Sequence, residues 1–400
     1  MRSNSTILRI AQYTLLLALL IPASQVAAAE RASHAQGILQ FYGVAEDGGR
    51  NHRTAAAYDR MKLVTDTGFD TVRSTVPWVQ GQKDLNHRDL ASIRNLIQVA
   101  ASHGTTVILT IYPYYDARTP VVSSEQWDFV NFLEYVTRIF PEVKYFEISN
   151  EPNLSFFWRP QFSSDGKNSS AQTYFRLLAR SYDRLKAINP EIIVIGGALA
   201  SRGGDDPGTS RKTSSPTVFI QKLGKAYRES GRTRPIMDWF SIHPYGVNSS
   251  EPPDTLHPNS TTIGFADYDK LVALLGEAFD GTAQEGSSVP ILYSEYGVET
   301  IISSEKVRLY RGEELPTTKP VSEETQAAYY KRALELAACQ PTVVGVLFFH
   351  ITDEASLNEG WQSGLYYADE KAKEGESLQK ASQPLVKKAI EKIQKGDMRC

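Results

Sequence analysis

Residues 145–153 read YFEISNEPN, a run that starts as a strand and stops in a turn. The part from Tyr145 to Ile148 is rich in aromatic and β-branched residues, which favour strands, whereas Asn150 and Asn153 favour turns. An acid, Glu151, lies between the two asparagines. This strand therefore delivers a carboxylate to its C-terminal end.

Short apolar runs of this kind alternate with longer amphipathic segments along the chain. The alternation predicts an α/β protein built as a single (β/α)8 TIM barrel over residues 30–400. A doubly wound open sheet is the main alternative, but no G-x-G-x-x-G segment follows the first strand. The predicted strands are residues 37–44, 70–77, 105–112, 143–150, 192–198, 237–244, 290–296 and 342–351, and the predicted helices lie near 53–67, 87–103, 124–138, 170–188, 216–230, 265–279, 323–338 and 383–394.

The long polar connections follow the strands rather than the helices. In an α/β barrel these loops form the face that holds the active site, and the opposite face serves stability. The longest are residues 112–123, 151–169, 199–215, 245–263, 297–322 and 352–382.

A second acid stands at the end of a strand, in the run ILYSEYG at residues 291–297. Glu295 ends the seventh predicted strand, as Glu151 follows the fourth. Strands four and seven lie across the mouth of such a barrel, where two carboxylates can face each other. Two facing carboxylates are the working part of a glycosidase.

With these motifs the chain resembles the retaining β-glycoside hydrolases of clan A, which include glycoside hydrolase families 5 and 39. The resemblance implies that Glu151 is the general acid/base and Glu295 the nucleophile. It also implies that Asn150 donates to the sugar 2-hydroxyl and that Arg73 holds Glu295 ionised. The expected reaction is a double displacement that retains the configuration at the anomeric carbon.

The run FSIHPY at residues 240–245 ends the sixth strand, where relatives in this clan place a His or Tyr beside the two acids. His243 or Tyr245 is expected to donate to Glu295, with Tyr245 favoured. The eighth strand departs from the simplest clan pattern, because Phe349 stands where many relatives have a Trp under the sugar. Phe349 or Trp361 is the candidate platform.

Other aromatic residues occur on the loops after the strands, where rings often stack on sugar faces. Tyr112, Trp78 and Trp158 complete the expected substrate-binding residues. Each of these rings could instead serve only loop packing.

The N-terminus carries Arg2 and Arg9 before an apolar run and a small-residue segment with an A-x-A pattern. This is typical of a signal peptide over residues 1–29, so a secreted protein, extracellular or periplasmic, is expected. No run is long enough to span a bilayer. The net charge of −3 comes with no basic block, which argues against a nucleic-acid partner.

The seven histidines show no metal-ligand spacing, and no phosphate-binding loop or serine elbow occurs, so we expect no metal and no cofactor. The expected partner is an oligosaccharide, polysaccharide or glycoside substrate, bound by a monomer. Two alternatives remain open: a transglycosylase using the same site, and a catalytically silent carbohydrate-binding barrel.

Two cysteines, Cys339 and Cys400, complete the chain's notable features. In an oxidising compartment they could pair and pin the C-terminus. The alternative is a buried Cys339 on a helix and a free Cys400.

Overall fold

The computed structural model describes residues 39–47, 53–113, 119–398 and 400. The predicted signal peptide lies outside these residues. Within them, parallel strands form a closed barrel in which each strand pairs with the next and β8 pairs with β1. The strands are β1 (Phe41–Ala45), β2 (Thr71–Trp78), β3 (Thr106–Pro113), β4 (Tyr145–Ile148), β5 (Ile193–Ala200), β6 (Trp239–His243), β7 (Ile291–Tyr296) and β8 (Val343–Phe349).

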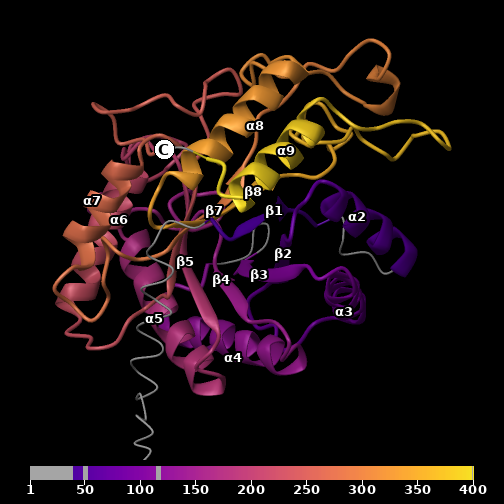
Figure 1. Ribbon diagram of the computed structural model, residues 1–400. Coiled ribbons are helices and arrows are strands. Elements are labelled where there is room, and N and C mark those ends of the chain that lie inside the picture. Colours follow the sequence, from indigo (N-terminus) through magenta and orange to yellow (C-terminus); the bar gives the residue numbers. More distant parts are fainter. Residues whose placement is uncertain (1–38, 48–52, 114–118, 399) are drawn as a thin grey trace, which may run out of the picture.

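Helices follow the strands and surround the barrel (Figure 1). They are α2 (Thr54–Asp66), α3 (His87–Ser102), α4 (Ser123–Ile139), α5 (Ser170–Ile188), α6 (Pro216–Glu229), α7 (Tyr268–Phe279), α8 (Glu323–Ala338) and α9 (Ser382–Gln394), with a short 3-10 turn η1 (Val307–Leu309) before α8. The predicted (β/α)8 barrel is confirmed, and the open-sheet alternative is excluded by the closure between β8 and β1.

Local sequence signals explain several helix starts. The Asn86 and Ser215 side chains accept from backbone N–H groups in the first turns of α3 and α6. Ser322 does the same for α8. Such caps satisfy N–H groups that have no partner within the helix. The helices thus begin directly after the loops that form the upper face of the barrel.

The barrel interior has an apolar lower end and a polar upper end. At the lower end, the rings of Phe41, Tyr145 and Trp239 from β1, β4 and β6 meet with centroids 5.2–5.5 Å apart. Side chains two residues further along a strand point the same way. Glu147 therefore lies above Tyr145, and Ser241 lies above Trp239. These aromatic side chains close the barrel at the N-terminal ends of the strands. The polar groups are therefore accessible only from the C-terminal ends of the strands.

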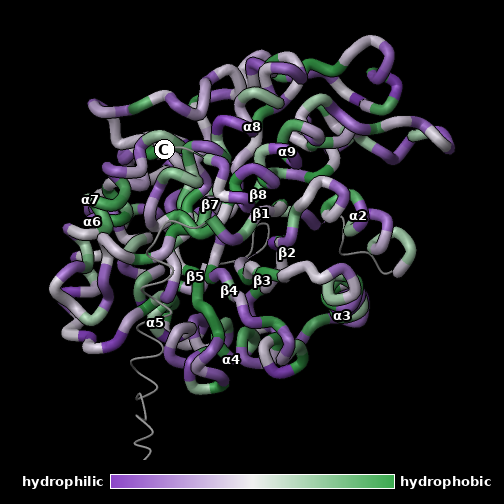
Figure 2. The backbone as a smooth tube through the Cα atoms, in the orientation of Figure 1, coloured by the Kyte–Doolittle hydropathy of each residue, from purple (hydrophilic) through white to green (hydrophobic). Residues whose placement is uncertain are grey.

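A larger apolar core fills the space between the strands and the helices. Figure 2 shows hydrophobic residues running along strands such as β5, as expected for strands buried on both faces. This double burial explains why the strands read as near-continuous apolar runs in the sequence.

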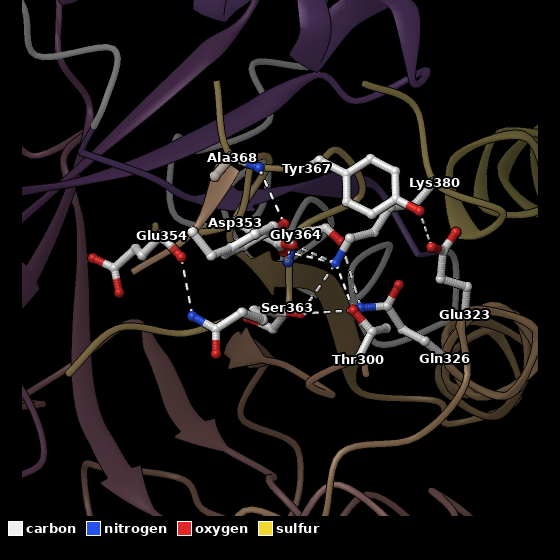
Figure 3. Close-up of polar contacts among 12 residues, drawn as sticks. Thr300, Glu323, Gln326, Asp353, Glu354, Ser363, Gly364, Tyr367, Ala368 and Lys380 are labelled. Carbon is white, nitrogen blue, oxygen red and sulfur yellow. Dashed lines mark hydrogen bonds and ion pairs between the residues drawn. The ribbon is translucent and has the colours of Figure 1, made fainter. Parts of the chain in front are cut away.

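A buried ion pair within the loop after β8 also contacts the loop after β7 (Figure 3). Lys380 Nζ lies 2.7 Å from Asp353, and both side chains are fully buried. Lys380 also donates to the Thr300 hydroxyl at 2.8 Å, and Asp353 accepts from Tyr310 and from the Gly364 amide. A buried pair of charges persists only with such additional hydrogen bonds. The cluster fixes two long loops that stand over the mouth of the barrel.

A disulfide bond joins Cys339, just after α8, to Cys400. Of the two possibilities for these cysteines, the structure contains the disulfide bond and not a free Cys400. In the described part of the chain, no helix is both long and apolar enough to cross a membrane.

Candidate active site

A buried cation, Arg73 on β2, organises the polar end of the barrel interior. Its Nε donates to Glu147, its Nη1 donates to Glu295 at 2.6 Å, and its Nη2 donates to the Asn150 carbonyl oxygen at 2.7 Å. A planar guanidinium can serve several carboxylate and carbonyl acceptors at once. Arg73 thereby joins β4, the turn after it and β7 in one network.

Glu147 is the fully buried partner below the site. Its carboxylate also accepts from Thr110 at 2.8 Å and from Ser241 at 2.6 Å. Burial alone would raise the pKa of Glu147, but Arg73, the charge of His243 and the Ser241 hydroxyl outweigh burial and lower it. Glu147 is therefore a fixed negative charge that holds Arg73 in place.

The turn after β4 presents Asn150 and Glu151 in an unusual backbone conformation. Ser149 and Glu151 have φ values of 75° and 38°, a left-handed region that non-glycine residues rarely occupy. The Glu151 amide donates to the Ala198 carbonyl at 2.8 Å, and the buried Asn153 side chain bonds backbone groups of Ala200. The turn is thus held against the end of β5, and such enforced conformations cluster at functional sites.

An irregularity in β7 directs Glu295 inward. The pairing of β7 with β8 shifts register between Tyr293 and Tyr296, and both tyrosines pack in the outer core. An extra residue in a strand re-aims the side chains that follow it. Glu295 consequently reaches Arg73 inside the barrel, and its other oxygen accepts from the Tyr245 hydroxyl at 3.2 Å.

His243 lies between the two acids. Its Nδ1 is 3.0 Å from an oxygen of Glu151 and 3.5 Å from an oxygen of Glu295. These two carboxylate oxygens can therefore be no farther apart than the two distances together. Burial lowers the pKa of His243, but the charges of Glu295 and Glu151 and the bond to Glu151 outweigh burial and raise it.

Both acids keep contact with water although they are enclosed. The side chains of Glu151 and Glu295 retain 15% and 11% of their exposure, whereas Glu147 below them has none. A carboxylate in such a position is shielded from bulk water and still open to a ligand from above. The arrangement can therefore deliver one proton and one nucleophile to the same bound group.

Tyr245, which donates to Glu295, belongs to a group of three aromatic side chains. The Tyr245 ring lies 5.4 Å from the Trp361 ring and 6.5 Å from the Phe349 ring, and the Phe349 and Trp361 centroids are 5.5 Å apart. Trp361 retains 37% of its exposure. The structure thus brings both platform candidates together beside the nucleophile candidate. On the other side, Tyr112 at the end of β3 contacts the Phe157 ring.

Trp78 and Trp158 require a correction, because they do not line the mouth. Both are fully buried: Trp78 packs on Phe129 of α4, and the Trp158 indole N–H donates to Thr173 of α5. A ring with no exposed surface offers no face to a sugar. These two tryptophans are packing residues between loop and helix, the reading that sequence had left open for each ring.

The sequence analysis did not assign Glu147, Thr110 or Ser241 to the site. The available signal was an acid at an inward position of β4, two residues from Tyr145. For a metal ion, the described residues contain no group of three or more His, Cys, Asp or Glu side chains suitably placed.

Solved structures that resemble this chain are glycoside hydrolases. A family 39 glycoside hydrolase from the gut symbiont Bacteroides cellulosilyticus is 17% identical, with a TM-score of 0.59 over 89% of this chain and 64% of its own. A family 39 β-xylosidase from Caulobacter crescentus is 15% identical, with a TM-score of 0.54 over 88% and 71%. A glucosidase from Croceicoccus marinus is 13% identical, with a TM-score of 0.60 over 89% and 68%.

At identities this low, the likeness shows a shared fold. The chain spans 64% and 65% of the lengths of the first two solved structures that it resembles. No protein-family model matches the sequence, and no curated protein matches it either.

Proposed function

We propose that this chain is a retaining β-glycoside hydrolase. The observation that carries the proposal is the pair of carboxylates, Glu151 in the turn after β4 and Glu295 on β7, which both approach one nitrogen of His243. Because these oxygens lie 3.0 Å and 3.5 Å from the same nitrogen, the distance between them cannot exceed the sum of the two. The two carboxyl groups are about 5–5.5 Å apart in retaining enzymes and at least about 6.5 Å apart in inverting enzymes. The spacing therefore favours direct attack by a carboxylate over attack by water.

Glu295 suits the role of nucleophile. It accepts hydrogen bonds from the Arg73 guanidinium and the Tyr245 hydroxyl, which fix its carboxylate inside the barrel mouth. In the first step a Glu295 oxygen bonds to the anomeric carbon while the bond to the leaving oxygen breaks. The electron pair stays on that leaving oxygen, which takes a proton from Glu151.

Glu151 suits the role of acid and base. In the described residues, its carboxylate has one hydrogen-bonding side chain, His243, and it is the more exposed of the two acids. In the second step Glu151 removes a proton from water, the water oxygen bonds to the anomeric carbon, and Glu295 leaves as a carboxylate. The proton count returns to its start.

Asn150 and the aromatic group beside Glu295 would position the sugar. The Asn150 carbonyl oxygen is occupied by Arg73, which leaves its amide N–H groups to donate to a sugar 2-hydroxyl. Phe349 or Trp361 would provide the apolar surface under the ring. We further propose that the substrate is an extracellular or periplasmic glycan or glycoside, which the signal-peptide pattern and the Cys339–Cys400 bond support.

The test is a panel of aryl β-glycosides with the wild type, Glu295→Ala and a control, Glu299→Gln, which changes a buried acid outside the site. The wild type and the control are expected to release the phenol, and Glu295→Ala is expected to be at least about 10³-fold slower. Added azide should restore turnover of Glu295→Ala and give the α-glycosyl azide.

Azide rescue of that configuration identifies both the nucleophile and the sugar. A β-glycosyl azide would instead contradict the assignment of Glu295. Binding of oligosaccharides without release from any aryl glycoside or intact polysaccharide would favour the silent carbohydrate-binding barrel.

A further inference from the structure

A tryptophan on the outer wall of the barrel is contacted by two cations. Trp127 belongs to α4, which lies beside α5 (Figure 1), and it retains 42% of its exposure. The guanidinium carbons of Arg180 and Arg184, both on α5, lie 5.0 Å and 5.8 Å from the centre of its ring. Distances below about 6 Å are typical of cation–π contacts. Two arginines therefore hold this ring in place while much of it stays open to solvent.

Arginines recur at every fourth position of α5. Arg176, Arg180 and Arg184 consequently share one face of the helix and follow one another at intervals of about 6 Å along its axis. Arg184 forms an ion pair with Glu134 of α4, which also pairs with Arg138 at 2.8 Å. One carboxylate thus serves two of the arginines on this surface.

Arg176 and Arg180 have no carboxylate partner among the described residues. Arg180 donates to the carbonyl and hydroxyl oxygens of Ser123 and to the side-chain oxygen of Gln126, at 2.8–3.2 Å. These acceptors are neutral. Arg176 forms no hydrogen bond and no ion pair in the described part of the chain. Burial and the positive charge of Arg176 lower the pKa of Arg180. An anion bound here would relieve the repulsion between the two cations.

Trp127, Arg176, Arg180 and Arg184 together are called the Trp–Arg patch. The chain as a whole carries a formal net charge of −3, so its overall field does not attract polyanions. Attraction of an anion to this surface must therefore come from the patch itself. The patch belongs to the outer ring of helices and not to the barrel mouth, so it is separate from the proposed active site.

The chemistry of the patch suits a polymer of acidic sugars. A planar guanidinium binds a carboxylate through two parallel hydrogen bonds, and arginines at regular intervals match anionic groups that repeat along a chain. A tryptophan ring offers an apolar surface on which a sugar can pack. The indole N–H of Trp127 has no acceptor among the described residues, so it is free to donate to a hydroxyl group.

A membrane surface fits the patch less well. Helices that lie on membranes present an apolar face to the lipid. Within α4 and α5, both of which the structure describes throughout, Trp127 is the single exposed large apolar side chain. One ring beside several guanidinium groups provides too little apolar surface for insertion.

We infer that the Trp–Arg patch binds an acidic polysaccharide, with its carboxylates on the arginines and a sugar unit against Trp127. The choice of a glycan as the polyanion rests on the proposed function, but the binding itself requires no turnover. Such a surface would hold a polymer close to the barrel mouth and raise its effective concentration there.

The test measures binding to sodium polygalacturonate and sodium alginate by affinity gel electrophoresis, with uncharged dextran and phosphatidylglycerol vesicles as alternative ligands. The variants are Trp127→Ala, Arg176→Gln and the double change Arg176→Gln with Arg180→Gln. Arg176→Gln removes no contact within the described residues, so it leaves the fold intact. The matched control, Arg88→Gln with Arg94→Gln, removes the same charge from two exposed positions on α3.

The wild type is expected to bind at least one of the two acidic polysaccharides and not dextran, and to lose most of this affinity between about 20 and 200 mM NaCl. The Kd should rise about threefold in Arg176→Gln and about tenfold in Trp127→Ala and in the double arginine variant. The control should match the wild type. Turnover of an aryl glycoside should be the same in all of these proteins.

Three results would overturn the inference. The wild type could bind neither acidic polysaccharide, it could bind dextran equally well, or the α3 control could lose as much affinity as the double arginine variant. Binding to the vesicles alone would assign the patch to a membrane instead. Patch-dependent binding by a protein that cleaved no glycoside would leave the inference standing, and the proposed function alone would fail.

Discussion

At the scale of single residues, Arg73 is the side chain on which the site depends most. It joins a buried structural acid, Glu147, to the nucleophile candidate Glu295 and to Asn150. Because one guanidinium serves all three, charge alone is not sufficient at this position.

Arg73→Lys therefore tests geometry with the charge kept. An ammonium group cannot reproduce the three directed bonds, so we expect kcat on an aryl glycoside to fall at least about 100-fold, with a stability loss of about 2–3 kcal/mol. Steady-state kinetics and urea unfolding measure the two effects. Arg311→Lys, at an exposed pair with Glu370, should change neither. A nearly normal kcat in Arg73→Lys would contradict the role of the three directed hydrogen bonds of the guanidinium.

The sequence allowed the upper residues of the site to be predicted but not the support below them. Glu151 and Glu295 stand out because each lies at or just after the C-terminal end of an apolar strand, where a barrel places its active site. Glu147 lies inside a strand, and only its partners Thr110 and Ser241 make its burial tolerable. The tryptophans failed as predictions because ring direction at a strand end depends on which helix packs there, as Phe129 does on Trp78.

At the scale of elements, residue type and spacing were sufficient to locate the strands and helices. Parallel strands buried on both faces must be apolar throughout, and that demand is visible in one sequence. The register shifts in the pairing of β5 with β6 and of β7 with β8 could not be predicted from the sequence, because one extra residue in a strand does not change its apolar composition. Those irregularities place Glu151 and aim Glu295, so the site's geometry required the structure.

The loop after β7 carries a buried acid that should make stability depend on pH. Burial, with the negative charge of Glu314 nearby, raises the pKa of Glu299 to about 7. A raised acid pKa means that the folded chain holds this proton more tightly than the unfolded chain. Protonation of Glu299 therefore adds to the free energy of unfolding. This contribution is complete below the unfolded pKa of about 4.5 and is lost as the pH rises through about 7.

Glu299→Gln removes this dependence. Between pH 4.5 and 8 the wild type should lose about 3 kcal/mol of unfolding free energy through this group, and the variant should not. Urea unfolding at pH 4.5, 6 and 8 measures the difference. Glu305→Gln, an exposed change on the same loop, serves as the control. Parallel pH curves for the wild type and Glu299→Gln would rule out a raised pKa.

The buried pair of Lys380 and Asp353 lies within the loop after β8 and reaches the loop after β7 through hydrogen bonds with Thr300 and Tyr310 (Figure 3). Lys380→Met leaves the carboxylate buried without its cation, and we expect a loss of about 3–5 kcal/mol of unfolding free energy. Lys380→Met combined with Asp353→Leu removes both charges and should be less damaging than the single change. Thermal unfolding of the three proteins decides this order. A double variant that is less stable than Lys380→Met would contradict the expectation that the unpaired buried carboxylate is the main cost.

At the scale of the whole molecule, the barrel is closed by pairing of β8 with β1 and strengthened by a covalent bond at the end of the chain. The bond between Cys339 and Cys400 spans 61 residues and ties the segment after α9 to the end of α8. Helices of a (β/α)8 barrel run opposite to the strands, so the end of α8 lies at the face away from Glu151 and Glu295. Stability and catalysis should therefore respond separately to this bond.

Cys339→Ala combined with Cys400→Ala tests that separation. Closing a loop of this length constrains the unfolded chain, so the double variant should lose about 4 kcal/mol of unfolding free energy in urea. Its kcat and KM at 25 °C should equal those of the wild type, because the bond lies at the face of the barrel opposite the carboxylates. Wild type treated with a reductant should fall to the stability of the variant, while the variant should not respond to reductant. If kcat fell along with stability, the lower face of the barrel would be coupled to the carboxylates, and the division of this fold into a stabilising end and a catalytic end would have to be abandoned.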